Sequence, residues 1–273
     1  MSKKSSSKTN FLAQGTILVI ASFVAKAIGM IYRIPLTHIL GDDGNGYYST
    51  ANEIYTIILM ISSFSLPLAV SRLVAEREYA GEVKNSYRVL ICSLRFAAVT
   101  GGILSILTFL LGGVITKYVM GVELASYALR VLAPAIFLFA LTGVLRGFFQ
   151  GHGTMVPTAV SQIIEQIINA IVSVAGAYVM LQYGLKLGEK KGDAELGTAL
   201  AAAGGTFGTV ASVGVALLFM IVIYLGYRNG FKRRMKKDKT RRRESDRAIY
   251  RAITYTILPI VLSTLVYNIS TII

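Results

Sequence analysis

Six ionisable side chains fall within stretches of the sequence that are otherwise apolar. Four are basic and two are acidic: Lys26, Arg95, Arg130, Arg251, Glu53 and Glu165. A charge at the centre of a bilayer costs about 2.5 to 3.5 kcal/mol on the insertion scale, so such residues normally face a bundle interior or a water-filled cavity. The chemistry that these residues predict is the recognition of a polar or charged ligand within a membrane.

The elements that must position these residues are membrane-spanning helices. Of the 273 residues, 54% are hydrophobic and only 15% are charged, and the mean hydropathy of +0.60 excludes an ordinary soluble domain. A spanning helix needs about 20 mostly apolar residues. Seven stretches qualify: Phe11 to Tyr32, Tyr47 to Ser71, Val89 to Ile115, Leu124 to Leu145, Met155 to Leu181, Thr198 to Tyr227 and Ala248 to Ile273. The sequence therefore predicts an all-α, polytopic membrane helix bundle.

Basic residues are distributed unequally between the two sets of connecting segments. Nineteen lie in the N-terminus and the second, fourth and sixth connections, where we place Arg146 in the fourth; five, among them Arg33, lie in the others. Because cytoplasmic loops carry the excess of Lys and Arg, we expect a multi-pass protein of the bacterial cytoplasmic membrane with a cytoplasmic N-terminus.

The intramembrane charges are layered by depth. At a rise of about 1.5 Å per residue, Lys26, Glu53 and Arg130 each lie roughly 9 Å below the outer surface. Arg95 lies at a similar depth from the inner surface, and Glu165 lies roughly 15 Å down the fifth span, near the midplane. We expect the charged groups to converge on one aqueous vestibule.

Helical spacing gives two of the spans a polar face. In the first span the face consists of Ser22, Lys26, Gly29 and Arg33, and in the fifth it consists of Thr158, Ser161, Gln162, Glu165, Gln166, Asn169 and Ser173. Each face is expected to meet water or a polar ligand.

Each of these features also has a structural interpretation. Lys26 and the arginines can snorkel to an interface along their long stems. Glu53 and Glu165 can form structural pairs or remain protonated and hydrogen-bonded. The polar face of the fifth span can instead hold two helices together.

Several other site types are excluded or disfavoured. Cys92 is the only cysteine, His38 and His152 lie in different connecting segments, and the glycine-rich runs are not followed by Lys-Ser or Lys-Thr. We therefore expect neither an enzyme nor a bound cofactor or metal. The basic run from Phe231 to Arg247 is expected to meet anionic lipid headgroups and not nucleic acid.

Three segments resemble a known family. They are Lys26-Ala-Ile-Gly-Met-Ile-Tyr-Arg-Ile-Pro-Leu36 with Leu40-Gly-Asp-Asp-Gly-Asn-Gly-Tyr47, Ser71-Arg-Leu-Val-Ala-Glu76, and the segment from Leu145 to Glu165. They are similar to segments of the polysaccharide biosynthesis proteins, which are related to stage V sporulation protein B and to the MurJ lipid II flippases of Gram-positive bacteria. These proteins belong to the multidrug/oligosaccharidyl-lipid/polysaccharide exporter superfamily.

The resemblance implies a two-lobed transporter that moves lipid-pyrophosphate-linked sugars by alternating access. It implies that Lys26 matches a basic residue that holds the pyrophosphate, while Arg33 lies near a second one. Family members are about twice as long, so we expect this chain to represent the N-terminal half and to lack its C-terminal lobe. The domains would be a cytoplasmic N-terminus (1–10), a six-helix lobe (11–227), a basic inter-lobe linker (228–247) and a seventh helix (248–273) of the other lobe.

The favoured function is flipping of an undecaprenyl-pyrophosphate-linked glycan, such as lipid II or a polysaccharide repeat unit. Lys26, Arg33 and Arg130 would contact this lipid-linked oligosaccharide. Four other residues would line the cavity or couple transport to an ion: Glu53, Glu165, Gln162 and Asn169. The alternatives are a cation-coupled multidrug exporter of the same superfamily and a non-transporting membrane scaffold for cell-wall synthesis.

Overall fold

The computed structural model describes residues 2–63, 65–192, 195–240 and 243–272 and is a bundle of long helices. Apolar runs of this length become helices because a helix pairs its own backbone groups where lipid offers no partners. In the described ranges the helices are α1 (Ser2–Ser62), α2 (Leu66–Tyr79), α3 (Val83–Tyr118), α4 (Ala125–Gly151), α5 (Val156–Lys191), α6 (Leu196–Lys237) and α7 (Asp246–Ile272). The predicted all-α class is confirmed.

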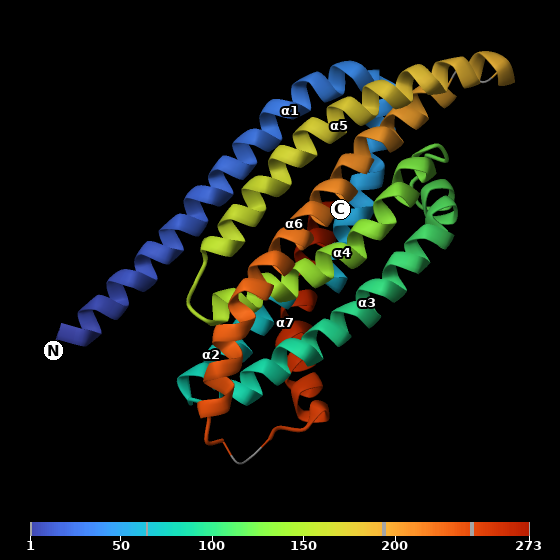
Figure 1. Ribbon diagram of the computed structural model, residues 1–273. Helices are drawn as coiled ribbons and strands as arrows, with labels where there is room; N and C mark the ends of the chain where they lie inside the picture. Colours follow the sequence, from blue (N-terminus) through green and yellow to red (C-terminus); the bar gives the residue numbers. More distant parts are fainter. Residues whose placement is uncertain (1, 64, 193–194, 241–242, 273) are drawn as a thin grey trace.

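Helix α1 contains the first predicted span and most of the second, which continues into α2. Gly41 has φ 65° and ψ −173°, a left-handed conformation that favours glycine, and the ribbon turns back there (Figure 1). The prediction that the first helix ends at Tyr32 is wrong: the helix continues past Arg33 and Pro35 and bends only at Gly41. Arg33 therefore belongs to a helix and not to a connecting segment.

Among the described residues, five stretches are long and apolar enough to cross a membrane: Gln14–Tyr79, Val83–Tyr118, Ala125–Gly151, Val156–Lys190 and Leu196–Lys237. The first has 66 residues. At about 1.5 Å per residue it is far longer than one crossing of a hydrocarbon core of about 30 Å. With the bend at Gly41 it holds the first and second predicted spans, which makes the chain a multi-pass membrane protein.

The two arms of α1 run in opposite directions, α2 continues the second arm, and each later helix reverses the direction of the one before it (Figure 1). The N-terminus, the α2–α3 and α4–α5 connections and the α6–α7 linker lie at one end, which we call the linker end. The bend at Gly41 and the α3–α4 and α5–α6 connections lie at the other, which we call the bend end. This alternation places the basic-rich predicted segments together at the linker end.

Small residues allow the closest helix contacts. A Cβ added at Gly204 would stand 2.2 Å from the carbonyl oxygen of Gly176, so α5 and α6 touch backbone to backbone. A Cβ added at Gly147 would stand 2.5 Å from the carbonyl oxygen of Pro67, which seats α4 against α2. These two contacts hold α5 close to α6 and α2 close to α4.

The start of α7 packs on the rest of the bundle. Ile249 and Ile253 are fully buried in a core cluster that includes Leu66 of α2 and Val89 of α3. Helix α6 continues to Lys237, so the first part of the basic segment 228–247 is helical.

Candidate functional site

A cavity of about 680 Å³ opens between the two halves of α1, near the bend end. Its lining residues come from both arms of the bend and from the α3–α4 connection: Tyr32, Arg33, Tyr48, Ser49, Asn52, Glu53, Thr56, Ile57 and Met120. Two predicted site residues, Arg33 and Glu53, are thus brought to one cavity. The bend at Gly41 makes this possible, because it folds the second arm back beside the first.

Polar contacts hold the wall of this cavity. The Asn169 side chain on α5 donates a hydrogen bond to the Tyr32 hydroxyl at 3.0 Å, and the Ser173 hydroxyl donates to the Asn169 carbonyl oxygen at 2.9 Å. Asn52 donates to the backbone oxygen of Tyr48 at 3.2 Å. Asn169, another predicted site residue, therefore reaches the cavity indirectly, by positioning Tyr32.

The polar faces predicted on the first and fifth spans meet each other. The Ser22 hydroxyl on α1 donates to the Gln162 side-chain oxygen at 3.4 Å. A Cβ added at Gly29 would lie 3.6 Å from the Gln166 side-chain oxygen. In this arrangement Gln162 contributes to the contact between α1 and α5, as the helix-pairing interpretation of the stripe expects.

Lys26 and Arg130 do not line the cavity. Lys26 is exposed on α1, two turns and about 10.5 Å along the helix from Arg33. Arg130 is exposed on α4, and its guanidinium lies 3.1 Å from the position that a Cβ of Gly113 would take. The single vestibule expected for Lys26, Glu53 and Arg130 is not seen among the described residues.

The prediction that Arg146 lies in the fourth connection is wrong. Arg146 lies inside α4, and its side chain is only 8% exposed. Its Nη2 lies 2.7 Å from the Glu165 carboxylate on α5, and its Nε donates to the Ser161 hydroxyl at 2.9 Å. Glu165 is thus neutralised by a partner that was not considered for it.

The residues that follow Leu145 explain why α4 extends beyond the predicted fourth span. Residues 147–156 contain no proline, and α4 ends at Gly151, two residues before Gly153, whose φ of 78° is a left-handed conformation. The helix therefore continues for more than one turn beyond Leu145, where the predicted span ends. Arg146 lies in this additional turn and is buried in the bundle.

A second group of charged side chains lies at the linker end. Glu78, in the last turn of α2 and beyond the predicted span, faces Nε2 of His152 at 3.2 Å and also pairs with Arg234 of α6. Burial of Glu78 opposes its ionisation, but His152 and Arg234 outweigh it and lower the pKa of the carboxyl from 4.5 to about 2. This group ties α2, the α4–α5 turn and α6 together.

The described part of the chain contains no cluster of side chains suited to bind a metal ion. No three His, Cys, Asp or Glu side chains gather there in a way that could hold an ion. The chemistry available at the cavity is that of Arg33, Glu53 and neutral hydrogen-bonding groups: binding a polar ligand by charge and hydrogen bonds.

Solved structures resemble this fold. An outward-facing multidrug resistance MATE family transporter of the MOP superfamily superposes with a TM-score of 0.75 at 20% identity, over 97% of this chain and 55% of that one. A MATE structure in complex with MaD3S gives a TM-score of 0.77 at 19% identity, again over 97% and 55%. These comparisons show the fold alone.

Curated relatives are similar in sequence. Stage V sporulation protein B of Bacillus subtilis is 27% identical over 80% of this chain and 39% of its own length. Lipid II flippase MurJ of the same organism is 28% identical over 63% of this chain and 33% of its own length. The chain thus spans well under half of these relatives.

The model of one protein family, described as polysaccharide biosynthesis protein, matches residues 11–271. This match includes the whole of α2 to α6, most of α1 and α7, and all residues that line the cavity. The chain therefore belongs to the polysaccharide biosynthesis protein family.

Proposed function

We propose that the chain forms the first lobe of a transporter that flips a lipid-linked glycan across the membrane by alternating access. The family, the flippase name of one relative and the MOP-type fold support this function. The proposed substrate class is an undecaprenyl-pyrophosphate-linked sugar, such as lipid II or a polysaccharide repeat unit. The proposed second lobe would supply the other side of the translocation path.

The observation that carries the proposal is the polar cavity between the two arms of α1. A pyrophosphate cannot cross hydrocarbon with its charge exposed, since an unsolvated charge there is costly. Arg33 can neutralise part of that charge, and Tyr32, Tyr48 and Asn52 can hydrogen-bond to oxygens of the headgroup. The lipid tail would remain in the bilayer throughout.

Lys26 extends this site along α1. It lies on the same helical stripe as Arg33 and is exposed, so the two cations would contact a phosphate in succession as it moves. Arg130 is proposed as a third contact, reached from α4. The face that carries Lys26 would be closed by the second lobe.

The driving force would come from an ion gradient or the membrane potential, worth about 2.3 kcal/mol per charge per 100 mV. Glu53, in the cavity, is the proposed coupling acid. Glu165 is paired with Arg146 in this conformation, and a coupling role for Glu165 would require that pair to open.

The orientation follows from charge. We propose that the linker end is cytoplasmic, because it carries most of the Lys and Arg in connecting segments. Anionic lipids would be attracted to the basic segment 228–247 at this surface. The proposed domains remain the lobe 11–227, this linker and the seventh helix 248–273.

Complementation of a lipid II flippase-deficient bacterial strain tests the function. The gene would be expressed with the sequence that adjoins this chain, as wild type and as Lys26→Ala, Arg33→Gln and a control, Lys117→Ala, whose side chain is exposed and off the cavity. We expect wild type and control to support growth and the Lys26 and Arg33 variants to fail at equal protein levels. Normal growth of both the Lys26 and the Arg33 variant would remove the cations from the mechanism.

The second candidate, a multidrug exporter, is favoured only by the fold shared with MATE transporters. Growth in the presence of cationic drugs separates the two functions. Drug resistance without complementation would establish the exporter, whereas complementation without drug resistance supports the flippase. A scaffold would still function with Lys26 and Arg33 replaced.

A further inference from the structure

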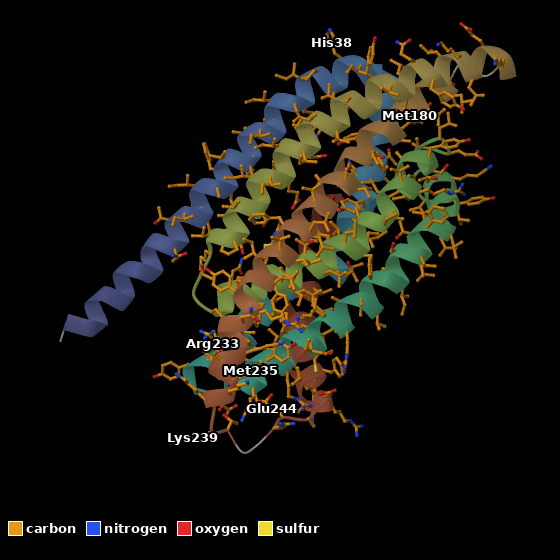
Figure 2. The ribbon with its side chains drawn as sticks, viewed as in Figure 1. His38, Met180, Arg233, Met235, Lys239 and Glu244 are labelled. Carbon is orange, nitrogen blue, oxygen red and sulfur yellow. The ribbon has the colours of Figure 1, made fainter. Side chains whose placement is uncertain are left out.

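A second cavity, of about 540 Å³, lies at the linker end and is not part of the proposed translocation path. Three segments that are distant in sequence form it: Lys84, Tyr87 and Arg88 at the start of α3, Lys232, Met235 and Lys236 at the end of α6, and Arg243 of the linker. Figure 2 shows Met235 at this end of the molecule, near Arg233, Lys239 and Glu244, while His38 marks the opposite end. Five of the seven lining side chains are cationic.

Neighbouring acids neutralise only part of this charge. Asp246 pairs with Arg88 and also approaches Arg95, at 3.6 Å. Asp238 accepts a hydrogen bond from the backbone N–H of Lys84, whose Nζ donates to the Asp238 backbone oxygen at 2.8 Å. Two acids therefore stand beside five cations.

Three of the lining cations remain without a counter-charge. Within the described ranges, Lys232, Lys236 and Arg243 form no ion pair. In addition, the Nε atom of Arg88 is buried and has no hydrogen-bond acceptor, which is uncommon for a buried donor.

The arrangement selects the chemistry of the acceptor. Guanidinium and ammonium groups that converge from several directions suit a multiply charged anion with several oxygens, and arginine in particular matches phosphate geometry. Tyr87 and Met235 supply less polar wall beside the cations. The cavity volume leaves room for the group that carries the phosphate.

We propose that this cavity is a binding site for a phosphoryl group, carried either by an anionic lipid headgroup or by a soluble phosphorylated metabolite. The proposal is more specific than a general attraction of the basic segment to anionic lipid, because it requires these lining residues and not their neighbours. A phosphoryl group held here would bridge α3, α6 and the linker. It would thereby fix the linker that leads into α7.

The chain offers a matched control for the test. The pocket variant is K232Q/K236Q/R243Q, and the control variant is R233Q/K237Q/K239Q. The control cations lie in the same basic segment and are exposed like those of the pocket variant, but they do not line the cavity. Both lose three positive charges. All proteins would also carry Lys26→Gln, Arg33→Gln and Arg130→Gln, so that pyrophosphate is not held by the three cations of the proposed translocation path.

The probe is radiolabelled inorganic pyrophosphate, measured by equilibrium dialysis against protein in phosphatidylcholine nanodiscs. We expect saturable binding that the pocket variant weakens by at least about tenfold, since hydrogen bonds to charged groups are among the stronger ones. We expect the control variant to change affinity by less than about twofold, because its three cations do not line the cavity and act on the ligand only through salt-screened longer-range charge. Equal melting temperatures of the variants would show that folding is unaffected.

Nanodiscs that also contain phosphatidylglycerol identify the source of the phosphoryl group. Loss of pyrophosphate binding in these discs would assign the cavity to a lipid headgroup, and persistence would assign it to a soluble phosphate. Absence of saturable binding in phosphatidylcholine discs would overturn the proposal. Equal weakening by the pocket and control variants would do the same, because it would reduce the cavity to diffuse charge.

Discussion

Replacing Arg146 by glutamine should destabilise the bundle by about 3 kcal/mol, because breaking a buried ion pair leaves the remaining charge uncompensated, at a cost of about 3 to 5 kcal/mol. The side chains of Arg146 and Glu165 are only 8% and 14% exposed and their charged atoms lie 2.7 Å apart, so water screens the pair little. We take the lower end of the range because glutamine is also polar and can keep the hydrogen bond to the Ser161 hydroxyl that Arg146 makes in the wild type. In the variant, Glu165 would keep a charge with no cation beside it.

The assay is thermal unfolding of the detergent-solubilised protein, followed by loss of helical circular dichroism. At about 2 to 4 °C per kcal/mol for a chain of this size, the melting temperature should fall by about 6 to 12 °C. Lys117→Gln is the matched control, since it removes one cation from a pair of similar length, 2.9 Å, that is 48% and 66% exposed. Exposed pairs contribute about 0 to 1 kcal/mol, so the control should change the melting temperature little.

The double variant Arg146→Gln with Glu165→Gln provides the decisive comparison. If the two side chains act as one pair, the double variant should lose less stability than the sum of the single variants, with a coupling of about 0.5 to 3 kcal/mol. Strict additivity would refute the reasoning. A shift for Arg146→Gln as small as that of Lys117→Gln would refute it as well.

Two further predictions concern packing and pH. Gly204→Ala should cost about 1 to 3 kcal/mol, because its Cβ would stand 2.2 Å from the carbonyl oxygen of Gly176, whereas Gly226→Ala meets nothing within 4 Å and should be neutral or slightly stabilising; equal melting temperatures of the two variants would contradict the close α5–α6 contact. The lowered pKa of Glu78 adds stability that is present above pH 4.5 and is lost as the pH falls toward about 2. Circular dichroism melts between pH 7 and 2 should show this loss in the wild type and a smaller one in Glu78→Gln; identical pH profiles would remove Glu78 from the linker-end network.

Hydropathy predicted the helices well but not where each helix ends. The first apolar run ends at Tyr32, but the helix does not end with it. The backbone remains helical until Gly41, which is the first residue of α1 with a non-helical conformation. The same reasoning fails at Leu145, beyond which α4 continues and buries Arg146. The length of an apolar run indicates how much of a helix lies in the hydrocarbon core. The length of the helix itself depends on where the backbone leaves the helical conformation.

The candidate site was predicted in part. Arg33 and Glu53 were both named from the sequence, but their meeting in one cavity depends on the bend that places the second arm of α1 beside the first. The polar stripes of the first and fifth spans were found from their spacing, although which of their residues pair with each other, such as Ser22 with Gln162, was not. Helical periodicity predicts which residues share one face of a helix, but it does not predict which other helix that face contacts.

The sequence by itself determined the membrane-embedded, all-α class, the alternation of the helices and the family, because a bilayer requires long apolar helices whatever their neighbours are. Only the tertiary structure decided which charges are neutralised and which remain available. Glu165 meets Arg146, nineteen residues away along the chain, while Lys232, Lys236 and Arg243 gather around a shared cavity. Electrostatic interaction depends on distances of a few ångströms between helices, and these distances are fixed by packing contacts that no local pattern of residues records.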